Sequence, residues 1–511
     1  MSYLQDVDIV INTKHIAKGD VFFCFKEAEK YISEENLQDA SKVYCTSGFV
    51  DRVFSESGCL HGVDVNNYKA KIYEKDDLNN FLVESLKTRY HQPANLIAIT
   101  GTKGKTSTAW YVMQIIGFCG KKCGYIGTIG VYSFDGIELQ KLNQDYILTT
   151  PDIDELYRYL HKFKQLGIDN VVFEASSHAL KQGRLNGLDI KYACFTNLSQ
   201  DHLDYHKTME EYFTAKSLLF LKYLNKNKGI CIINNDDVYG KKLVEICKKH
   251  NLSIKTIGLT EDNDLNIKSI KQLKSGQEVC FFANGKTYDI YTEILGEFQI
   301  LNIAEAIEIC CSIDGIKYSD IFKSCSKIVA PIGRMQKILN TNIFIDFAHT
   351  PKSLEESIKL LKSRYEKVAV LFGCGGNRDR QKRPIMCEIA TKMANFVVIT
   401  SDNPRHEKPE EIIKDITCFL RKDYNNELIN DEFVKNEIKK IDIKYNSDIC
   451  EVKVIENRRE AIDFIVNKFL NVSKLAVVIA GKGHEAYQII GEEKKHFSDY
   501  EEVQKAIAKL K

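Results

Sequence analysis

A glycine-rich turn between an apolar run and a helix-like segment has the residue types and spacing of a phosphate-binding loop. The apolar run is Asn95–Thr100, and helical spacing of apolar side chains starts at Ala109. The turn consists of Gly101, Thr102, Lys103, Gly104, Lys105, Thr106 and Ser107. Backbone N–H groups and the positive end of a helix dipole attract phosphate, the lysine adds charge, and a threonine hydroxyl can ligate Mg²⁺.

The turn departs from the general P-loop pattern in its length. That pattern has four residues between its first glycine and the Gly-Lys pair, whereas only Thr102 and Lys103 separate Gly101 from Gly104 here. The alternative is a structural glycine turn between a strand and a helix. Because Gly-Lys-Thr-Ser directly follows a strand-like run, we predict a site for ATP and Mg²⁺.

Other apolar runs of strand length also end in polar, glycine-rich or ionisable clusters. These clusters start at Glu174, Thr196, Asp346, Gly373, Asp402 and Gly481. Ligands of open α/β sheets bind beyond the carboxyl ends of the strands. A single cluster of this kind is more often a turn or a helix cap, but the repetition predicts a cleft for several substrates.

Two of the clusters hold candidate metal ligands. Glu174 and His202 both follow strand-like runs downstream of the phosphate-binding turn, and a carboxylate near phosphate oxygens suits Mg²⁺. Taken alone, His202 is equally well explained as a structural histidine. Ser176-Ser177-His178 lacks the glycines of a nucleophile elbow, so the sequence disfavours a hydrolase.

Basic residues gather after the strand-like runs of the C-terminal third. They are Arg378, Arg380, Lys382, Arg383 and Arg405. Guanidinium groups bind planar carboxylates through paired hydrogen bonds. We predict such a role for Arg378 and Arg405, whereas Arg380 and Lys382 also fit a solvated basic surface.

The bulk composition excludes several classes of protein. A chain of 511 residues is too long for one core, which favours about three domains. Lys+Arg 71 against Asp+Glu 70 gives no global field for nucleic acid. No membrane-length apolar run and no signal pattern occur, and the 16 scattered cysteines lack zinc spacing. We therefore expect a cytoplasmic protein without stable membrane insertion or nucleic-acid partner.

Strand candidates alternate with helical stretches from Asn95 onward, which predicts an α/β protein with parallel sheets. The strand candidates are Val171–Phe173, Tyr192–Phe195, Ile230–Ile233, Ile343–Phe347, Val368–Phe372, Phe396–Thr400 and Leu475–Ala480. Upstream, Val21–Phe25 and Lys42–Cys45 predict a small α/β domain. The polar stretch Leu252–Tyr291 predicts antiparallel strands that close the first sheet, and Leu295–Cys311 predicts a helix.

The ordered motifs resemble those of the Mur ligases. They are Gly101-Thr-Lys-Gly-Lys-Thr106, Glu174-Ala-Ser-Ser-His178, Asn197 with Asp201-His202-Leu-Asp204, Asn302, Gly333-Arg334-Met335, Asp346-Phe-Ala-His349-Thr-Pro and Gly481-Lys-Gly-His-Glu485. The resemblance implies a three-domain architecture: a UDP-binding α/β domain (1–92), a central P-loop-type parallel-sheet ATPase domain (93–330), and a C-terminal Rossmann-like domain that binds an amino acid (331–511). Phe25–Glu29 stands where the family has a glycine-containing loop.

Mur ligases use ATP to add amino acids to the growing peptidoglycan peptide. This sequence looks most like the members that add the third residue to UDP-N-acetylmuramoyl-L-alanyl-D-glutamate. The resemblance implies that the γ-carboxylate of the D-glutamate is phosphorylated by ATP and that the incoming amine then attacks the acyl phosphate. Such chemistry depends mainly on positioning and charge neutralisation.

The resemblance also implies roles for individual residues. Lys105 and Thr106 hold the phosphates and metal, Glu174 and His202 bind a second Mg²⁺, and Asn302, Arg334 and Asp346 contact the nucleotide. The muramoyl-dipeptide contacts are Thr13, Thr149, Thr150, Ser176, Gln182 and Arg184. Lys216 falls where the family carries a carbamylated lysine (N6-carboxylysine) that binds magnesium, although an arbitrary lysine there would be an ordinary helix-surface residue.

The choice of third residue is usually associated with the motif Asp402-Asn403-Pro404-Arg405. The resemblance implies meso-2,6-diaminopimelate, and the chemistry agrees because its distal carboxylate can pair with a guanidinium whereas lysine has none. The residues assigned to this substrate are Arg378, Asp402, Asn403, Arg405, Gly481 and Glu485. The alternatives are an L-lysine-adding Mur ligase, a folylpolyglutamate synthetase-like ligase, and a nucleotide-binding regulator without turnover. We expect a monomer.

Overall fold

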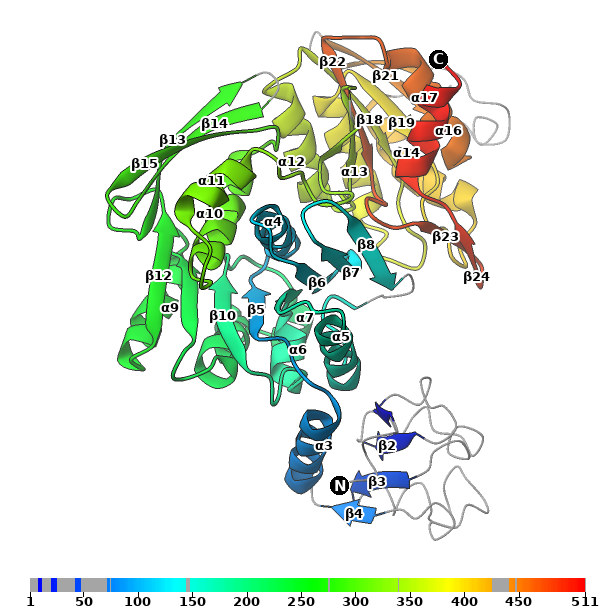
Figure 1. Cartoon of the computed structure of the whole chain (residues 1–511). Helices are drawn as coiled ribbons and strands as arrows, with labels where there is room; N and C mark the ends of the chain where they lie inside the picture. Colours follow the sequence, from blue (N-terminus) through cyan, green and yellow to red (C-terminus); the bar gives the residue numbers. More distant parts are fainter. Residues whose placement is uncertain are drawn as a thin grey trace, which may run out of the picture. The chain divides into compact units, whose positions relative to one another are not determined.

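The computed structural model describes residues 8–11, 20–24, 42–46, 71–73, 75–143, 148–273, 276–338, 340–424, 441–445 and 448–510. The chain divides into two compact units, and most of their elements are labelled in Figure 1. The P-loop unit comprises Met1–Lys268, Phe281–Tyr288 and Leu301–Cys325. The C-terminal unit comprises Ser269–Cys280, Asp289–Ile300 and Ser326–Lys511.

The largest sheet has 11 strands, in the order β15-β14-β13-β12-β11-β10-β5-β9-β6-β7-β8. Strand β5 (Asn95–Thr100) pairs in parallel with β10 (Ile190–Phe195) on one side and with β9 (Asn170–Glu174) on the other. Almost every residue of these three strands is buried, as expected for parallel strands covered on both faces. The strands predicted at these positions are confirmed.

Beyond β10 the sheet continues in parallel. Strand β12 (Ser253–Gly258) pairs in parallel with β11 (Ile230–Asn234) and with β13 (Leu265–Leu273). The antiparallel closure predicted for Leu252–Tyr291 is therefore wrong at β12. Helix α9 (Val238–Lys249) connects the end of β11 to the beginning of β12, as a parallel connection requires.

Hairpin-like strands complete both edges of this sheet. On one edge β6 (Cys123–Gly127) is parallel to β9, and β7 (Gly130–Phe134) and β8 (Leu139–Asn143) follow in antiparallel pairing. On the other edge lie β14 (Gly276–Ala283) and β15 (Lys286–Thr292).

Helix α4 (Lys105–Phe118) follows β5 and is buried almost all round. Every residue from Thr106 to Gly117 is buried. The buried surface of α4 is therefore wider than the single apolar face that the spacing from Ala109 predicts. The reason is that β6, β9 and helix α11 (Tyr318–Cys325) all pack on α4. The other helices of this unit are α3 (Lys75–Arg89), α5 (Ile153–Gln165), α6 (Ser177–Gln182), α7 (Leu203–His206), α8 (Met209–Leu218) and the π-helix η5 (Leu219–Tyr223). The helix predicted at Leu295–Cys311 is confirmed as α10 (Glu297–Cys311).

A small parallel sheet lies near the N-terminus, in the order β1-β2-β3-β4. Its strands are β1 (Ile9–Val10), β2 (Val21–Cys24), β3 (Lys42–Thr46) and β4 (Lys71–Tyr73). Arg158 on α5 donates to the Ile9 carbonyl at 3.2 Å, which ties β1 to the larger sheet's helices. The predicted contact Thr13 lies outside the described residues.

The C-terminal unit contains a seven-stranded sheet in the order β16-β17-β22-β18-β19-β21-β20. The strands are β16 (Gln336–Lys337), β17 (Ile343–Asp346), β18 (Lys367–Phe372), β19 (Phe396–Ile399), β20 (Ile441–Tyr445), β21 (Asp448–Val454) and β22 (Leu475–Ala480). All pairs from β17 to β21 are parallel, and the four strands predicted here are confirmed.

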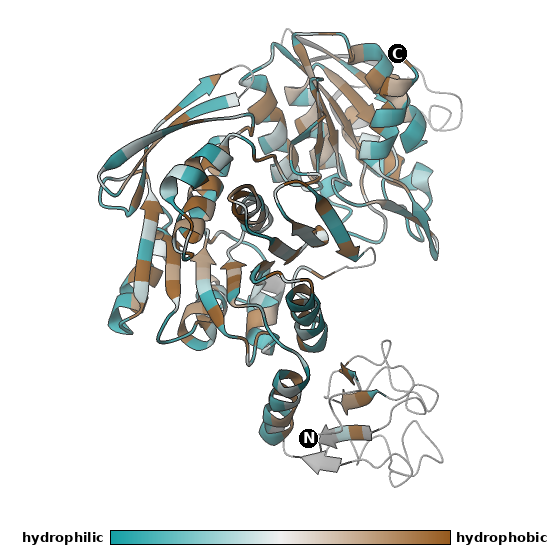
Figure 2. Ribbon diagram, viewed as in Figure 1, coloured by the Kyte–Doolittle hydropathy of each residue, from teal (hydrophilic) through white to brown (hydrophobic). Residues whose placement is uncertain are grey.

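Helices cover the C-terminal sheet, and apolar residues concentrate on its strands (Figure 2). Side chains of α12 (Pro351–Lys362), α13 (Lys382–Met393) and α14 (Pro409–Tyr424) share one core cluster, and those of α16 (Arg458–Phe469) and α17 (Asp499–Ala508) share another. A hairpin of β23 (Tyr487–Ile490) and β24 (Glu493–His496) follows β22. Within the described ranges, no helix is long and apolar enough to cross a membrane.

Candidate active site

The turn after β5 requires glycine at two positions. Gly104 precedes α4 with a φ of 88°, and a Cβ there would lie 2.4 Å from Asn302 Oδ1. A Cβ on Gly101 would lie 1.9 Å from Thr196 Oγ1. A side chain cannot be accommodated at such distances, so glycine permits the close approach of α10 and of the β10 strand end. The predicted nucleotide contact Asn302 therefore lies at the turn.

The residues after β10 hold this turn in place. Thr196 Oγ1 donates to the Lys103 carbonyl at 2.6 Å, and the Lys103 amide donates to Asn197 Oδ1 at 3.0 Å. The Thr102 amide donates to the Asn197 carbonyl at 2.8 Å. Two of the predicted strand-end clusters thus meet, while Ser107 is buried within α4. We call the Gly101–Ser107 turn, held in this way, the cradle.

Two lysine side chains converge on one carbonyl group of the cradle. Lys105 Nζ donates to the Gly101 carbonyl at 2.9 Å and to the Thr102 carbonyl at 3.0 Å. Lys216 Nζ, from α8, donates to the same Gly101 carbonyl at 2.7 Å. Only 1% of Lys216 is exposed, so it is not a helix-surface lysine.

The surroundings of Lys216 disfavour a positive charge. Burial lowers the pKa of Lys216 well below its usual value, and repulsion from Lys105 lowers it further, while Asp201 raises it. A neutral amine, or a modified anionic form, is therefore easier to maintain here than on a solvated helix. The cradle itself gathers positive charge, as a polyphosphate site requires.

Glu174 is buried at the end of β9 and accepts four hydrogen bonds. Its Oε2 accepts from Thr106 Oγ1 at 3.0 Å and from Thr128 Oγ1 at 3.1 Å. Its Oε1 accepts from Tyr125 OH at 2.6 Å and from the Thr128 amide at 2.8 Å. Thr106 and Glu174, which were predicted to bind separate metal ions, are in contact here and offer oxygen donors, which suit magnesium. Sequence reasoning missed Tyr125 and Thr128, which carry no motif of their own.

His202 has a different set of neighbours. It is half exposed, and its Nε2 lies 3.7 Å from Asp201 Oδ2. Its ring makes edge-to-face contacts with the rings of His178 and Tyr212. Among the residues that the structure describes, no group of three or more His, Cys, Asp or Glu side chains is arranged to hold a metal ion. Thr106 and Glu174 are in contact, and His202 is not part of that contact.

The predicted dipeptide contacts lie around Glu174. Thr150 Oγ1 donates to the Glu174 carbonyl at 2.8 Å and lies 3.2 Å from Ser176 Oγ. Thr149 Oγ1 lies 3.2 Å from Thr128 Oγ1, which itself contacts the Glu174 carboxylate. Arg184 Nη1 donates to the Thr150 carbonyl at 2.8 Å, and its Nε donates to Gln182 Oε1 at 2.9 Å. The structure therefore brings Thr149, Thr150, Ser176, Gln182 and Arg184 together.

A second buried carboxyl group lies one turn after Asn302. Thr108 Oγ1, on α4, donates to Glu305 Oε2 at 2.7 Å. Burial raises the pKa of Glu305 to about 8, although the bond from Thr108 lowers it and Asp237 raises it. No sequence motif pointed to Glu305, because its burial depends on the packing of α10 against α4.

Arg334 and Asp346 lie together in the C-terminal unit. Asp346 Oδ1 accepts from the amides of Met335 at 3.2 Å and Phe347 at 2.9 Å, and Ser357 Oγ donates to its Oδ2 at 2.5 Å. Burial raises the pKa of Asp346, which the Ser357 hydrogen bond and Arg334 oppose. The Arg334 guanidinium lies 4.8 Å from the centre of the Phe347 ring.

The predicted amino-acid contacts meet where β19 and β22 end. Asn403 Nδ2 donates to Glu485 Oε2 at 2.8 Å, and a Cβ on Gly481 would lie 2.6 Å from Asp402 Oδ2. Arg405 has a φ of 52°, and its Nη1 donates to the Gly376 carbonyl at 2.9 Å. A left-handed backbone is uncommon for a residue with a side chain and often marks a functional position.

The neighbouring basic residues divide into two groups. Arg378 is exposed and lies near Arg405, since a Cβ on Gly375 would lie 2.9 Å from Arg405 Nη1 and 3.8 Å from Arg378 Cγ. The Arg383 side chain is fully buried, and it pairs with both oxygens of Glu407 at 2.9 and 3.0 Å. Of this basic cluster, Arg383 is therefore structural.

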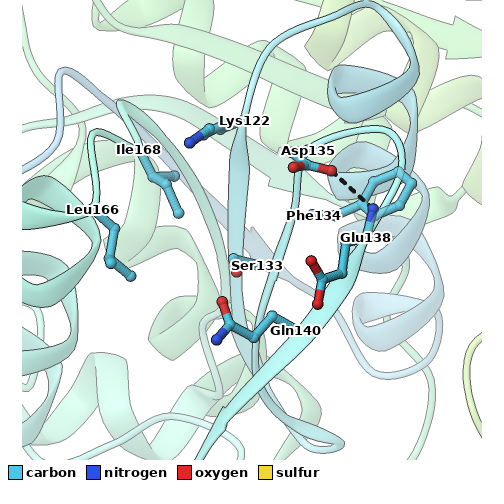
Figure 3. A pocket seen from close by; sticks show the side chains of 8 residues that line it. All are labelled: Lys122, Ser133, Phe134, Asp135, Glu138, Gln140, Leu166 and Ile168. Carbon is cyan, nitrogen blue, oxygen red and sulfur yellow. Dashed lines mark hydrogen bonds between the residues drawn. The ribbon is translucent and has the colours of Figure 1, made fainter.

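One cavity lies away from these residues. Figure 3 shows a cavity of 110 Å³ between β7, β8 and the end of α5. It is lined by Lys122, Ser133, Phe134, Asp135, Glu138, Gln140, Leu166 and Ile168. None of the predicted site residues lines this cavity, so the candidate site rests on the strand-end clusters.

Family comparisons match two large parts of the chain. The description "Mur ligase middle domain" matches residues 99–310, and "Mur ligase, glutamate ligase domain" matches residues 333–483. The first match begins within β5 and includes the cradle, Glu174, Lys216 and Asn302. The second includes Arg334, Asp346 and the Asp402–Arg405 motif.

Whole proteins resemble the chain over nearly its full length. The UDP-N-acetylmuramoyl-L-alanyl-D-glutamate--2,6-diaminopimelate ligase of Rickettsia conorii is 37% identical over 97% of this chain and 95% of its own length. A solved structure of an enzyme with that name has a TM-score of 0.64 at 28% identity, covering 98% of this chain and 95% of its own. The folylpolyglutamate synthase of Mycobacterium tuberculosis, solved with ADP and AMPPCP, has a TM-score of 0.56 at 18% identity over 79% of this chain and 91% of its own.

Proposed function

Since the chain belongs to the Mur ligase family, we propose that it joins meso-2,6-diaminopimelate to UDP-N-acetylmuramoyl-L-alanyl-D-glutamate and converts ATP to ADP and phosphate. The observation that supports this proposal most directly concerns Glu174. It is hydrogen-bonded both to Thr106 of the cradle and to Thr150, one of the predicted dipeptide contacts. An acceptor carboxylate must meet the γ-phosphate of ATP, and both residue sets are hydrogen-bonded to Glu174.

The reaction proceeds in two balanced steps. The γ-carboxylate of the D-glutamate attacks the γ-phosphorus of ATP, which forms an acyl phosphate and releases ADP. The amine of diaminopimelate then attacks the acyl carbon, forms the amide bond, loses a proton and expels phosphate. The chain's residues contribute position and charge in both steps.

Lys105 and the start of α4 bind the phosphates in this proposal. The Lys105 ammonium, already directed at the cradle carbonyls, moves its hydrogen bonds to phosphate oxygens when these arrive. The backbone N–H groups of the turn and the dipole of α4 add to the same attraction. Asn302 contacts the nucleotide from α10, and nucleotide contacts are also proposed for Arg334 and Asp346.

The donor set at Glu174 fits Mg²⁺. Thr106 Oγ1 and the Glu174 carboxylate are oxygen donors 3.0 Å apart, and His202 would complete a second site. Bound Mg²⁺ would neutralise charge on the transferred phosphoryl group. Tyr125 and Thr128 orient the Glu174 carboxylate through their hydrogen bonds.

We further propose that Lys216 is carbamylated. Its neutral amine adds CO₂ and releases a proton, so that an anionic carbamate, and not an ammonium, lies beside Lys105. Burial and the nearby Lys105 both lower the pKa of Lys216, which favours the neutral amine that reacts. The carbamate supplies oxygen donors that magnesium prefers.

Arg405, with Arg378, pairs with the distal carboxylate of diaminopimelate in this proposal. Asp402, Asn403, Gly481 and Glu485 surround its amino groups. L-lysine lacks that carboxylate, so a site whose guanidinium groups pair with the distal carboxylate discriminates against lysine. The cytoplasmic location and the monomeric state stay predictions from the sequence.

The acceptor requirement tests this function. ADP release should depend on both UDP-muramoyl-L-alanyl-D-glutamate and an amino acid, and a folate acceptor should not replace the muramoyl dipeptide. Release that depends on folate and glutamate would instead support the folylpolyglutamate synthetase alternative. A protein that binds ATP but releases no ADP with any acceptor would support the regulator alternative.

A further inference from the structure

We propose that Lys482 is a positioning residue that sets the orientation of Asn403 and the charge of Glu485 in the amino-acid site without contacting the substrate. The proposal rests on the proposed function, because Asn403 and Glu485 are assigned there to diaminopimelate. Lys482 itself had no role in the sequence analysis. Its side chain is completely buried, whereas that of Glu485 is 19% exposed.

Three groups surround the Lys482 ammonium. It donates to Asn403 Oδ1 at 3.2 Å and to the Tyr487 carbonyl, and it lies 3.7 Å from Glu485 Oε2. Two of its three N–H groups thus make hydrogen bonds, and the Glu485 carboxylate lies at ion-pair distance. The lysine thereby joins the end of β19, the loop after β22 and the start of hairpin β23–β24.

The contacts of Lys482 decide which way the Asn403 amide points. Asn403 Oδ1 accepts from Lys482 Nζ and from the Ile489 amide at 3.0 Å, which leaves its Nδ2 to donate to Glu485 Oε2. A flipped amide would place N–H groups against two donors and its oxygen against a carboxylate. Only the observed orientation of the Asn403 amide satisfies all partners. The Lys482 ammonium contributes most to the energy difference between the two orientations, because its hydrogen bond is charge-assisted.

Lys482 also counters a concentration of negative charge. Burial and Asp402 raise the pKa of Glu485, and Lys482, Asn403 and Arg405 lower it. Tyr487 and Arg458 also lie within electrostatic range of Glu485. A Glu485 carboxylate that binds a substrate ammonium must be ionised, and Lys482 supports that state from the side away from solvent.

Another buried cation in the same unit shows the contrast. Arg458 pairs with Asp499 through two hydrogen bonds of 2.7 Å, and both side chains are completely buried. Its carboxylate partner lies on α17 and has no assignment to a substrate. The side-chain partners of Lys482 are two residues of the amino-acid site, so its loss should act on substrate binding rather than on the fold alone.

The test compares Lys482→Met and Lys482→Gln with the wild type in steady-state ADP release. Methionine retains the aliphatic stem without the charge, and glutamine retains a donor for Asn403 Oδ1. The matched control is Lys474→Met, an exposed lysine of the same unit that pairs with Glu366. KM is measured for ATP, for UDP-muramoyl-L-alanyl-D-glutamate and for meso-diaminopimelate, together with Tm.

We expect KM for diaminopimelate to rise about 10- to 100-fold in Lys482→Met and less in Lys482→Gln. KM for the other two substrates should stay within about threefold of wild type. The acid limb of kcat/KM for diaminopimelate should shift to higher pH in both variants, because each removes a charge that lowers the pKa of Glu485. In a Glu485→Gln background, Lys482→Met should cost clearly less than in wild type.

Two results overturn the inference while leaving the proposed function intact. One is an unchanged KM for diaminopimelate in an active Lys482→Met enzyme. The other is an equal loss for all three substrates, or loss of folding in both variants, which marks a structural residue. A wild-type protein without diaminopimelate-dependent ADP release contradicts the proposed function itself and the inference with it.

Discussion

The two units handle buried positive charge in opposite ways. In the P-loop unit, the side-chain nitrogens of Lys105 and Lys216 converge on the single carbonyl of Gly101, and repulsion from Lys105 lowers the pKa of Lys216. In the C-terminal unit, Arg458 is matched by Asp499, and Arg383 by Glu407, through short paired hydrogen bonds. The first arrangement disfavours a second positive charge, and the second pairs each cation with a carboxylate.

This difference distinguishes a site that binds an anion from ion pairs that stabilise the fold. Converging cations become favourable only when a phosphate, or a carbamate on Lys216, supplies negative charge. Paired buried ions need no ligand, and removing one partner leaves the other charge unpaired. Lys105 should therefore affect turnover with little effect on stability, whereas the carboxylate-paired Arg383 and Arg458 should do the reverse.

The largest expected effect follows from removing the cation of the cradle. Lys105→Ala should lower turnover about 1,000-fold or more, because it removes the fixed charge at the transferred phosphoryl group. Tm should stay close to wild type. The assay is ADP release with all substrates, and Lys248→Ala, an exposed lysine of the same unit, is the control. Near-normal ligation by Lys105→Ala would contradict the nucleotide assignment.

Substitutions of Lys216 test whether the sign of the charge at this position determines activity. Lys216→Ala should lose most activity and regain part of it when a short-chain carboxylate is added to the buffer. Lys216→Arg should remain inactive, since a guanidinium stays positive and supplies no oxygen donor. Activity is measured with and without acetate, and Lys222→Ala on η5 is the control. An active Lys216→Arg enzyme would refute the carbamate proposal.

Arg405 tests whether a cation of the C-terminal unit also serves a ligand. Arg405→Ala should cost roughly 2–5 kcal/mol in kcat/KM for diaminopimelate, or about 30- to 5,000-fold, because a desolvated carboxylate loses its partner. KM for ATP and for the muramoyl dipeptide should change little. Arg380→Ala, which removes an exposed arginine of the same basic cluster, is the control. Retained use of diaminopimelate would show that Arg405 is structural.

The smallest effect concerns a buried carboxyl group beside the cradle. The pKa of Glu305 is about 8 in the folded chain, above its usual 4.5, so the folded state holds the proton more tightly. Stability should therefore fall as pH rises from about 4.5 to 8. Glu305→Gln should flatten this dependence and raise Tm at pH 8 by about 2–4 °C. The measurement is thermal unfolding at several pH values.

The matched control for that experiment is Glu245→Gln. Glu245 is exposed, and its hydrogen bond to Lys248 lowers its pKa below the usual value, outside this pH window. A Tm profile of Glu305→Gln that parallels the wild type would contradict the assignment of Glu305 as a group that is neutral when folded.

Local pattern predicted the elements that carry the site, and tertiary contacts decided the rest. Strand β5 and the turn after it could be read from an apolar run followed by glycines. The burial of Lys216 could not, because its partner Gly101 lies 115 residues earlier in the chain. Arg383 is a similar case, since its carboxylate partners lie 24 and 32 residues away. A residue's type and neighbours indicate what it can do, and distant contacts determine which choice is realised.

The parallel pairing of β12 illustrates the same limit for the fold. Its polar sequence resembles an edge strand, and only the connection through α9 fixes its direction. Tyr125 and Thr128, which orient Glu174, come from β6 and the turn after it rather than from the Glu174 motif. Motifs therefore predicted the site residues that carry them, such as Glu174. The residues that orient these side chains, such as Tyr125 and Thr128, became evident only from the three-dimensional structure.

The ratio of kcat/KM for meso-diaminopimelate to that for L-lysine tests the central claim most directly. The wild-type protein is assayed for ADP release with UDP-muramoyl-L-alanyl-D-glutamate, ATP and each amino acid in turn, and the product mass is determined. We expect a ratio of about 100 or more, since lysine leaves Arg405 without its carboxylate partner. A ratio near one, or a preference for L-lysine, would contradict it.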